Sequence, residues 1–269
     1  MFGNTNDPES LNKSKYDVLV KDCVFEEPNR NNDAAGIQQR LYNSIQNIKI
    51  LNNTIINFYD TISNYVGGTT VQNELIEGND AEGDEAFCLS VGANFRELGI
   101  GNTVVQHITI KNNNYLGGFD LGAIIFGANF SGGNNGWSDL KVDATGNCFV
   151  GGFIGIAGVN FGATAGNGTI NAHNNNFTNF SIDIADGLAN PCNFDYFAQQ
   201  NFWDGVPNVI NDGTGVVDVS NPLLVPITCP KKRYCFTEPI QIANSEAKVS
   251  SLTNEERLEK VKEKLQNKQ

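Results

Sequence analysis

Three aspartates have the residue type that carbohydrate hydrolysis needs. Asp120 lies in the stretch GGFDLG, and Asp183 and Asp186 lie in SIDIADG. Two carboxyl groups about 5 to 10 Å apart can cleave a glycosidic bond, one as the acid and the other as the base or nucleophile. We expect Asp183 and Asp186 to lie near each other because they are close in sequence. The alternative is that all three are solvated surface acids, since an acidic chain brings such pairs together by accident.

A second group of acids lies in YVGGTTVQNELIEGNDAEGDE, residues 65–85. This stretch is rich in glycine and acids and has little apolar pattern, so we interpret it as a long loop inserted into the fold. Carboxylate oxygens are the ligands that Ca²⁺ prefers in proteins. Glu77, Asp80, Glu82 and Asp84 are therefore candidate calcium ligands, and a plain loop without metal is the alternative. No other cofactor is expected.

Six cysteines are scattered along the chain, and only Cys229 and Cys235, in TCPKKRYCF, are close together. We expect a local disulfide between these two in an oxidising compartment, and the alternative is six buried free thiols. The chain has no CxxC pair and only 2 histidines, which disfavours a zinc site. His107 and His173 are interpreted as packing or surface residues rather than as catalytic bases.

The formal net charge of the chain is −12, and 9 of its 18 basic residues lie in residues 230–269, which leaves the rest of the chain strongly acidic. An acidic body disfavours a nucleic-acid partner, because phosphate binding needs clustered Lys and Arg. It also disfavours docking on an anionic membrane surface. No stretch approaches the roughly 20 apolar residues of a membrane span, so no membrane insertion is expected.

Glycine and asparagine are the most frequent turn residues, with 28 Gly and 39 Asn in 269 residues. Both tolerate the left-handed backbone of tight turns, so this chain turns often. Six stretches fit one eight-residue frame, with mostly apolar residues at the first, third and eighth positions and mostly Asn at the sixth. They are VLVKDCVF (18–25), IKILNNTI (48–55), ITIKNNNY (108–115), VDATGNCF (142–149), INAHNNNF (170–177) and YFAQQNFW (196–203).

The frame recurs at intervals of 30, 60, 34, 28 and 26 residues, and the interval of 60 contains the expected loop. A second motif, found in SVGANF, IFGANF and AGVNF, keeps the same period. Such a period, combined with apolar alternation by two, predicts an all-β solenoid with three short strands in each coil. Stacked coils lie about 4.8 Å apart, so equivalent side chains meet. The sixth positions should form a hydrogen-bonded ladder at one corner: Asn53, Asn113, Asn147, Asn175 and Asn201.

The coil type ITIKNNNY and the closing stretch NFWDGVPNVINDGTGVVDVSNPL (201–223) resemble the right-handed parallel β-helix proteins of the pectin-lyase-like superfamily. The resemblance covers roughly residues 17–223 and implies a right-handed parallel β-helix of about six coils. It leaves function open, because this fold hosts lyases, hydrolases, phage spikes, adhesins and structural proteins. Lyases of the superfamily use Ca²⁺ with an arginine base. The arginines of this body lie in no matching motif: Arg30, Arg40 and Arg96.

Both ends of the predicted solenoid differ from its body. Residues 1–16 are a polar N-terminal segment, and residues 224–249 leave the repeat and should form a cap or linker. Residues 250–269 predict an amphipathic helix, because Thr253 and Glu256 match a capping box. We expect this helix to bind a partner chain, and the alternative is that it lies back on the solenoid. Its apolar stripe consists of Leu258, Val261 and Leu265.

These patterns favour a non-catalytic structural or adhesive protein at the exterior of a cell or virion. Its partners would be other protein subunits, in a homo-oligomer or a shell, or glycans. The start MFGNTNDPES does not resemble a signal peptide, which favours a virion protein over a secreted one. A polysaccharide lyase or glycoside hydrolase acting along the solenoid face is the alternative, and a carbohydrate-binding module is a third. An enzyme needs acids converging in a cleft, whereas a structural protein needs a flat face.

Overall fold

The computed structural model describes residues 14–28, 34–92, 103–117, 122–128, 136–162, 165–231 and 253–267, and these form almost only β-strands. Every strand pairing among them is parallel. The predicted all-β parallel fold is therefore confirmed.

The strands form two sheets. The eight-stranded sheet contains, in spatial order, β1 (Ser14–Lys21), β4 (Ser44–Leu51), β6 (Thr70–Glu77), β8 (Val104–Lys111), β11 (Trp137–Thr145), β13 (Gly166–His173), β15 (Phe194–Phe197) and β18 (Val217–Asp218). The ten-stranded sheet runs through β16 (Phe202–Trp203), β14 (Asn176–Ala189), β12 (Cys148–Asn160), β10 (Gly122–Ala128), β7 (Asp80–Gly92), β5 (Thr54–Gly67) and β2 (Val24–Glu26). In this sheet β3 (Ala35–Tyr42) pairs with β5, β9 (Asn114–Gly117) with β7 and β12, and β17 (Val209–Asn211) with β14.

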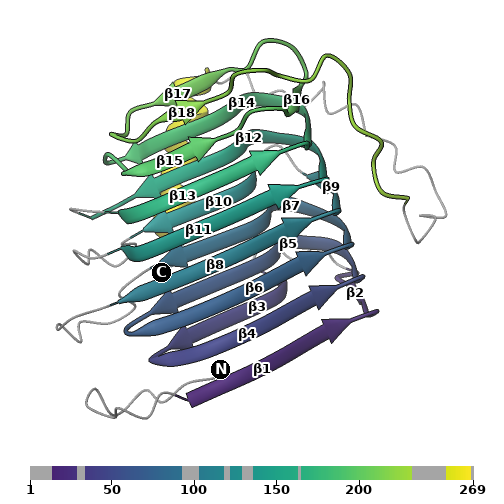
Figure 1. Ribbon diagram of the computed structural model, residues 1–269, viewed down its shortest axis with the longest axis vertical. Coiled ribbons are helices and arrows are strands. Elements are labelled where there is room, and N and C mark those ends of the chain that lie inside the picture. The colour runs from purple at the N-terminus through teal and green to yellow at the C-terminus, as the bar shows by residue number, and fades with distance from the viewer. Residues whose placement is uncertain are drawn as a thin grey trace.

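The chain passes alternately through the two sheets, so that each passage lies over the one before (Figure 1). We call one passage through both sheets a layer. Val18 of the first layer lies opposite Ile48 of the second, and Ile48 lies opposite Glu74 of the third. Residues at the same position of the eight-residue frame therefore stack in columns.

The core lies between the two sheets and is filled by columns of apolar side chains. Aromatic rings stack at one side of it, with centroids 5.6 Å apart for Phe87 and Phe149, 5.3 Å for Phe149 and Phe177, and 4.8 Å for Phe177 and Trp203. All four rings are buried. A second apolar cluster, which includes Phe153, covers the outer face of the ten-stranded sheet.

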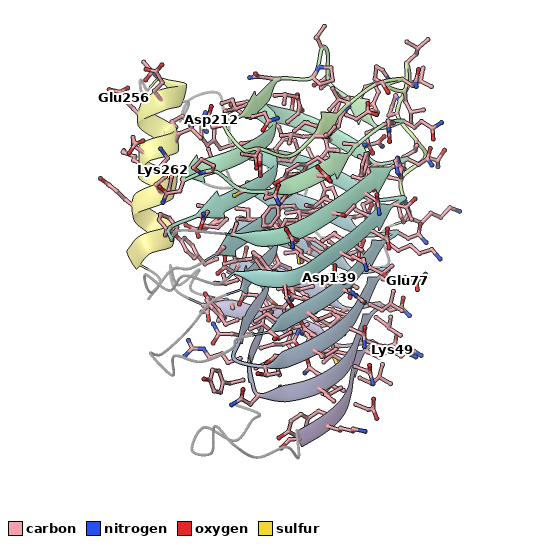
Figure 2. All side chains as sticks on the ribbon, turned by 60° about the vertical axis from the view of Figure 1, so that its left-hand side comes forward. Lys49, Glu77, Asp139, Asp212, Glu256 and Lys262 are labelled. Carbon is pink, nitrogen blue, oxygen red and sulfur yellow. A yellow bond between two sulfur atoms is a disulfide. The ribbon has the colours of Figure 1, made fainter. Side chains whose placement is uncertain are left out.

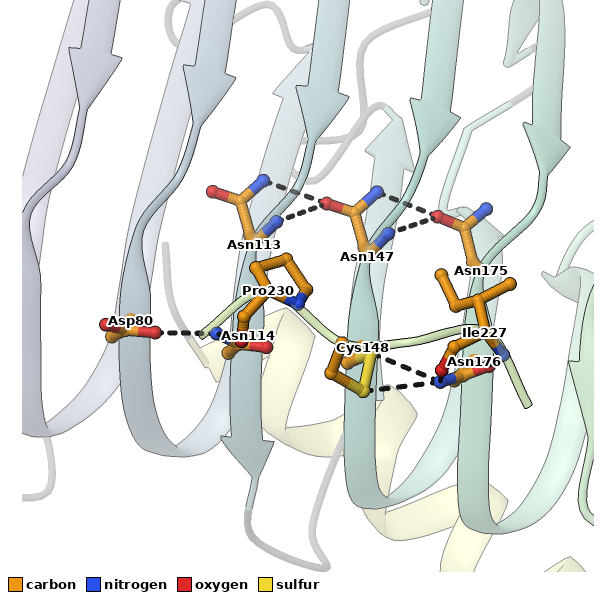
Figure 3. The surroundings of a disulfide bond; sticks show 10 residues. Asp80, Asn113, Asn114, Asn147, Cys148, Asn175, Asn176, Ile227 and Pro230 are labelled. Atoms are coloured by element: carbon orange, nitrogen blue, oxygen red, sulfur yellow. Dashed lines mark hydrogen bonds between the residues drawn. A yellow bond between two sulfur atoms is a disulfide. The ribbon is translucent and has the colours of Figure 1, made fainter. Parts of the chain in front are cut away.

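Asparagines at the corner after six strands of the eight-stranded sheet, from β4 to β15, form one buried column. Each Nδ2 donates to the Oδ1 of the next asparagine at 2.8–3.0 Å, and each backbone N–H donates to the same oxygen. Figure 3 shows the links between Asn113, Asn147 and Asn175. The structure thus places the five predicted ladder residues in one column, together with Asn79. The column contains Asn53, Asn79, Asn113, Asn147, Asn175 and Asn201.

The three asparagines 112–114 have three different roles. Asn112 adopts a φ of 54°, in the left-handed region that Gly and Asn tolerate best. Asn113 belongs to the ladder, and Asn114 begins β9. The residue equivalent to Asn112 has a positive φ in every layer: Asp22, Asn52, Gly78, Gly146, Asn174 and Gln200. The corner conformation therefore explains why Asn and Gly recur beside the ladder.

The prediction of a loop at residues 65–85 is wrong. These residues include the end of β5, all of β6 and the start of β7, and β6 and β7 together form the third layer. The interval of 60 residues is thus two layers, and Asn79 is the corner asparagine of the added layer, between Asn53 and Asn113. The pattern was hidden because Glu74 stands at the first frame position, where the other layers have an apolar residue.

The boundaries at the N-terminal end also differ from the prediction. β1 begins at Ser14, so the first strand includes part of the segment 1–16 that was expected to precede it. Residues 1–13 lie outside the described part of the chain, and so do residues 232–252, which make up most of the expected cap or linker.

The C-terminal helix α1 (Asn254–Asn267) has a capping box at its start. The N–H of Glu256 donates to Thr253 Oγ1 at 3.2 Å, and the N–H of Thr253 donates to Glu256 Oε2 at 2.7 Å. Glu255 and Glu256 both lie in its first turn, where they interact favourably with the positive end of the helix dipole.

Helix α1 lies beside the outer face of the ten-stranded sheet (Figure 2). The Arg257 guanidinium lies 4.2 Å from the centroid of the Phe153 ring, and Leu258 packs against the apolar cluster of that face. Leu258 thus contacts the chain's own sheet, which agrees with the alternative that the helix lies back on the body of the fold. The side chains of Val261 and Leu265 lie outside the described part of the structure.

Replacing a ladder asparagine should destabilise the protein strongly. In Asn113→Ala, the N–H and Nδ2 of Asn79 lose their acceptor and the Ile76 carbonyl loses a donor, all in a buried corner. Because each orphaned buried polar group costs about 1–3 kcal/mol, we expect a loss of roughly 3 kcal/mol or more in the free energy of unfolding, measured by urea denaturation. The exposed Asn47, which bonds Asp17 on the outer face, is the matched control. Equal losses for Asn113→Ala and Asn47→Ala would contradict a stabilising role of the column.

Candidate functional site

The two candidate catalytic acids on β14, Asp183 and Asp186, have different hydrogen-bond partners. Oδ2 of Asp183 accepts from the backbone N–H of Asn208 at 2.8 Å. Oδ1 of Asp186 accepts from the Tyr196 hydroxyl at 2.7 Å. Burial raises the pKa of each carboxyl to about 6. The third candidate, Asp120, lies outside the described residues.

Asp186 lies inside the fold rather than in an open cleft. Its side chain is 0% exposed, and so is that of Tyr196. The Cys192 thiol beside it is also buried, and burial raises the pKa of this thiol. Asp186 can take up a proton near pH 6, but a polysaccharide chain cannot reach it without opening the layers. Asp183 and Asp186 therefore do not form an accessible acid pair in this structure.

A buried acid that the sequence analysis did not identify lies in the third layer. Glu74 points inward from β6, and it accepts from Gln39 Nε2 at 2.9 Å through Oε1 and from Asn64 Nδ2 at 2.7 Å through Oε2. Its burial raises its pKa to about 7, and the two amide donors partly oppose this shift. The signal that could have found it is an acid at a frame position that is otherwise apolar.

Glu74 belongs to a polar network inside the core that is built on a column of glutamines. Gln106 Nε2 donates to Gln72 Oε1 at 2.6 Å, and Gln72 Nε2 donates to Gln46 Oε1 at 2.9 Å. The column ends where Gln106 Oε1 accepts from Trp137 Nε1 at 2.9 Å. In the sequence, a glutamine recurs two residues before the first position of the eight-residue frame, in IQNI, VQNE and VQHI. This recurrence was the signal for the column.

The candidate calcium ligands lie on or beside strands rather than in a loop. Asp80, Glu82 and Asp84 belong to β7, and Asp80 Oδ1 accepts from Asn114 Nδ2 at 2.7 Å. Glu77 ends β6 and lies 3.7 Å from Lys111 Nζ. Among the residues that the structure describes, no group of three or more His, Cys, Asp or Glu side chains is arranged to hold a metal ion.

The two histidines lie on the outer face of the eight-stranded sheet, in different layers. His107 Nε2 lies 3.1 Å from Asp139 Oδ2, which Lys141 Nζ also contacts at 3.0 Å. His173 Nδ1 lies 3.0 Å from the Gln199 carbonyl. Figure 2 shows Asp139 projecting from this face. Neither histidine contacts Asp183 or Asp186, so the structure does not join an imidazole to the candidate acids.

The predicted disulfide between Cys229 and Cys235 is wrong, because Cys229 bonds Cys148 instead. Cys148 lies on the corner column next to the ladder, and the two cysteines are 81 residues apart in sequence. A local pairing was expected from sequence proximity alone, whereas the chain after β18 folds back along the corner. Cys235 lies outside the described residues, and Cys23, Cys88 and Cys192 are free thiols.

Residues 224–231, which we call the strap, run along this corner (Figure 3). Asn176 exchanges two hydrogen bonds with the backbone of Ile227, at 2.8 and 3.0 Å, and Asn114 Nδ2 donates to the Pro230 carbonyl at 3.0 Å. The strap thus crosses successive layers and is fixed to one residue of each. A polar depression of about 320 Å³ lies beside it, between the corner residues and Lys231.

Comparisons of the chain with protein-family models, with curated proteins and with solved structures find no match. In the part of the chain that the structure describes, no helix is both long and apolar enough to cross a membrane.

Glu74 should make the protein less stable as the pH rises. Its pKa is about 7 in the folded protein against 4.5 ordinarily, so the folded state holds the proton more tightly. Stability is therefore lost as the pH rises from about 4.5 through about 7. We expect the free energy of unfolding of Glu74→Gln, taken relative to that of the wild type, to be roughly 2–3 kcal/mol higher at pH 8 than at pH 5. Urea denaturation at the two pH values measures it. Glu77→Gln, outward-facing on the same strand, is the control. Its free energy of unfolding should change with pH as that of the wild type does. An identical slope for Glu74→Gln and the wild type would contradict a buried ionisable Glu74.

Peptide mapping under non-reducing conditions should yield a linked pair of peptides that contain Cys148 and Cys229. Reduction, or a Cys148→Ser substitution, should make the strap sensitive to protease, because the disulfide is its covalent attachment to the corner. The layers should remain protected, since the ladder and core do not include the strap. Cys88→Ser is the control. Recovery of a Cys229–Cys235 peptide instead would contradict the pairing.

Proposed function

We propose that this protein is a non-catalytic structural or adhesive protein at the exterior of a virion or cell, and that it acts through contacts with protein subunits or glycans. We further propose that its parallel sheets form a right-handed parallel β-helix of the pectin-lyase-like type. Strands that alternate between two sheets and stack in parallel register support this finer description.

The observation that carries the functional proposal is the enclosed location of two of the three acids whose pKa is raised to about 6 or 7. Glu74 and Asp186 are enclosed among side chains of the interior, where they bond amides and a phenol rather than facing a cleft. Perturbed acids at a catalytic site lie where substrate can reach them. Their enclosure supports a structural role, and raised pKa values are then a consequence of burial.

The outer face of the eight-stranded sheet supports a binding role. Its polar side chains are held by their neighbours in adjacent layers: Asn47 Nδ2 donates to Asp17 Oδ1 at 2.9 Å, and Asn73 Nδ2 donates to Asn47 Oδ1 at 3.0 Å. Asn171 bonds Asp143 in the same way at 3.0 Å. Polar groups that are already ordered lose less entropy on binding, which suits contact with another protein or a glycan.

The disulfide between Cys148 and Cys229 supports an exterior location. Disulfides persist in oxidising surroundings and are rare where thiols are kept reduced. A strap that is covalently closed onto the corner also suits a protein exposed to proteases. Glycan cleavage is the second candidate function, and Asp183, which is 8% exposed, is the acid that favours it.

Two measurements test this proposal. Antibodies raised against the full chain should label intact source particles or cells before permeabilisation, and labelling only afterwards would contradict an exterior location. Acidic and neutral polysaccharides incubated with the full chain should yield no new reducing ends and no unsaturated uronates. Turnover that is abolished in Asp183→Asn and retained in Asp22→Asn, an exposed acid at the corner of the first layer, would establish the enzyme instead.

A further inference from the structure

Within the described part of the chain, the first layer has an unpaired backbone edge. Among the described residues, β1 pairs only with β4, and β2 and β3 pair only with β5. β1 lies at the N-terminal end of the stack (Figure 1). The N–H of Asp22 donates to the carbonyl of Leu51, on the β4 side. Because backbone groups alternate between the two sides of a regular strand, the odd-numbered residues of β1 direct their N–H and C=O groups to the open edge.

The core beneath this edge is also incomplete. Val18, Val20 and Phe25 are only partly buried, although the residues opposite them in the second layer, Ile48, Ile50 and Ile55, are 0–3% exposed. Leu19 and Val24 of the first layer are 62% and 56% exposed. A further layer placed against this end would bury the same columns that close the rest of the core.

We propose that this layer is supplied by a second copy of the chain, paired antiparallel across β1 about a twofold axis through Leu19. Residues directly opposite each other in an antiparallel strand pair project to the same face of the sheet. A residue on the outer face of one copy must therefore lie opposite a residue on the outer face of the other copy. Centred on Leu19, this pairing places Asp17 of each copy opposite Lys21 of the other. It also places Val18 opposite Val20 on the inner face, where the two cores become continuous.

The charges of β1 select this register over its neighbours. Centring the pair on Val18 places Lys15 opposite Lys21, and centring it on Asp17 places two aspartates opposite each other. Like charges directly opposite destabilise a strand pair, whereas opposite charges stabilise it. In the antiparallel pair centred on Leu19, the acid Asp17 of each copy thus faces the base Lys21 of the other copy on the exposed face.

Among the described residues, the opposite end of the stack offers only short edge strands: β16, β17 and β18 have two or three residues each, whereas β1 has eight. There the chain after β16 closes the core, with Trp203 2% exposed and stacked on Phe177. The strands β17 and β18 complete the two sheets at that end. A head-to-head pair about β1 therefore closes after two copies instead of growing into a filament.

This inference deepens the proposed structural role and rests on it for its biological meaning. The two can fail separately. A monomer would overturn the inference and leave the proposed function standing, and glycan turnover would overturn the proposed function and leave the dimer standing.

The mass of the full chain in solution tests the pairing. Light scattering after gel filtration, at about 1 to 100 µM protein, should show twice the chain mass for the wild type. Leu19→Lys should weaken the dimer at least about tenfold, because it places two like charges in contact at the axis. Leu75→Lys, on the same outward column of the internal strand β6, should remain dimeric. A monomeric wild type would mean that Lys15 and Lys21 protect the edge or that another segment covers it, and either result overturns the proposal.

A charge exchange tests the register. Asp17→Lys alone should weaken the dimer, because a lysine would then face Lys21 of the other copy. Adding Lys21→Asp should restore it. A dimer that Asp17→Lys does not weaken, or that the double exchange does not restore, would overturn this register. A dimer that persists unchanged in Leu19→Lys would overturn the interface itself.

Discussion

The whole structure depends on the parallel register between successive layers. Because each residue lies opposite the equivalent residue of the next layer, any side chain must be compatible with its counterparts above and below it. An asparagine amide satisfies this condition at a corner, since it donates through Nδ2 and accepts through Oδ1 at the same time. The buried column from Asn53 to Asn201 uses both groups in every layer, and it holds the corners in line.

The same condition explains which polar groups the core tolerates. Glutamines stack as asparagines do, and Gln46, Gln72 and Gln106 form a second column inside the sheets. A carboxylate only accepts hydrogen bonds, so two ionised acids cannot continue a column. Glu74 and Asp186 accordingly lie beside amide and hydroxyl donors, and burial raises their pKa values. These shifts are a property of the architecture and need no catalytic explanation.

The architecture also determines the polarity of the outer faces of the two sheets. One sheet presents ordered polar side chains to solvent, and the other carries an apolar cluster against which Leu258 of α1 packs. The strap closes one corner through Cys148 and Cys229. Apolar side chains are exposed in the first layer, at Leu19 and Val24, and also in the last layers, at Val206 and Val216.

The sequence alone determined the features that repeat. Asparagine at the sixth frame position and apolar alternation by two predicted parallel strands and the alignment of the corner asparagines, because a periodic fold repeats its local rules in every layer. It did not determine what departs from the repeat: Glu74 concealed the third layer, and the Cys148–Cys229 pairing joins residues that only the fold brings together. The distinction between accessible and enclosed acids, as for Asp186, was likewise decided by the tertiary structure. Burial and long-range contacts depend on how layers and returning segments pack, and a residue's own neighbours in sequence carry no record of that packing.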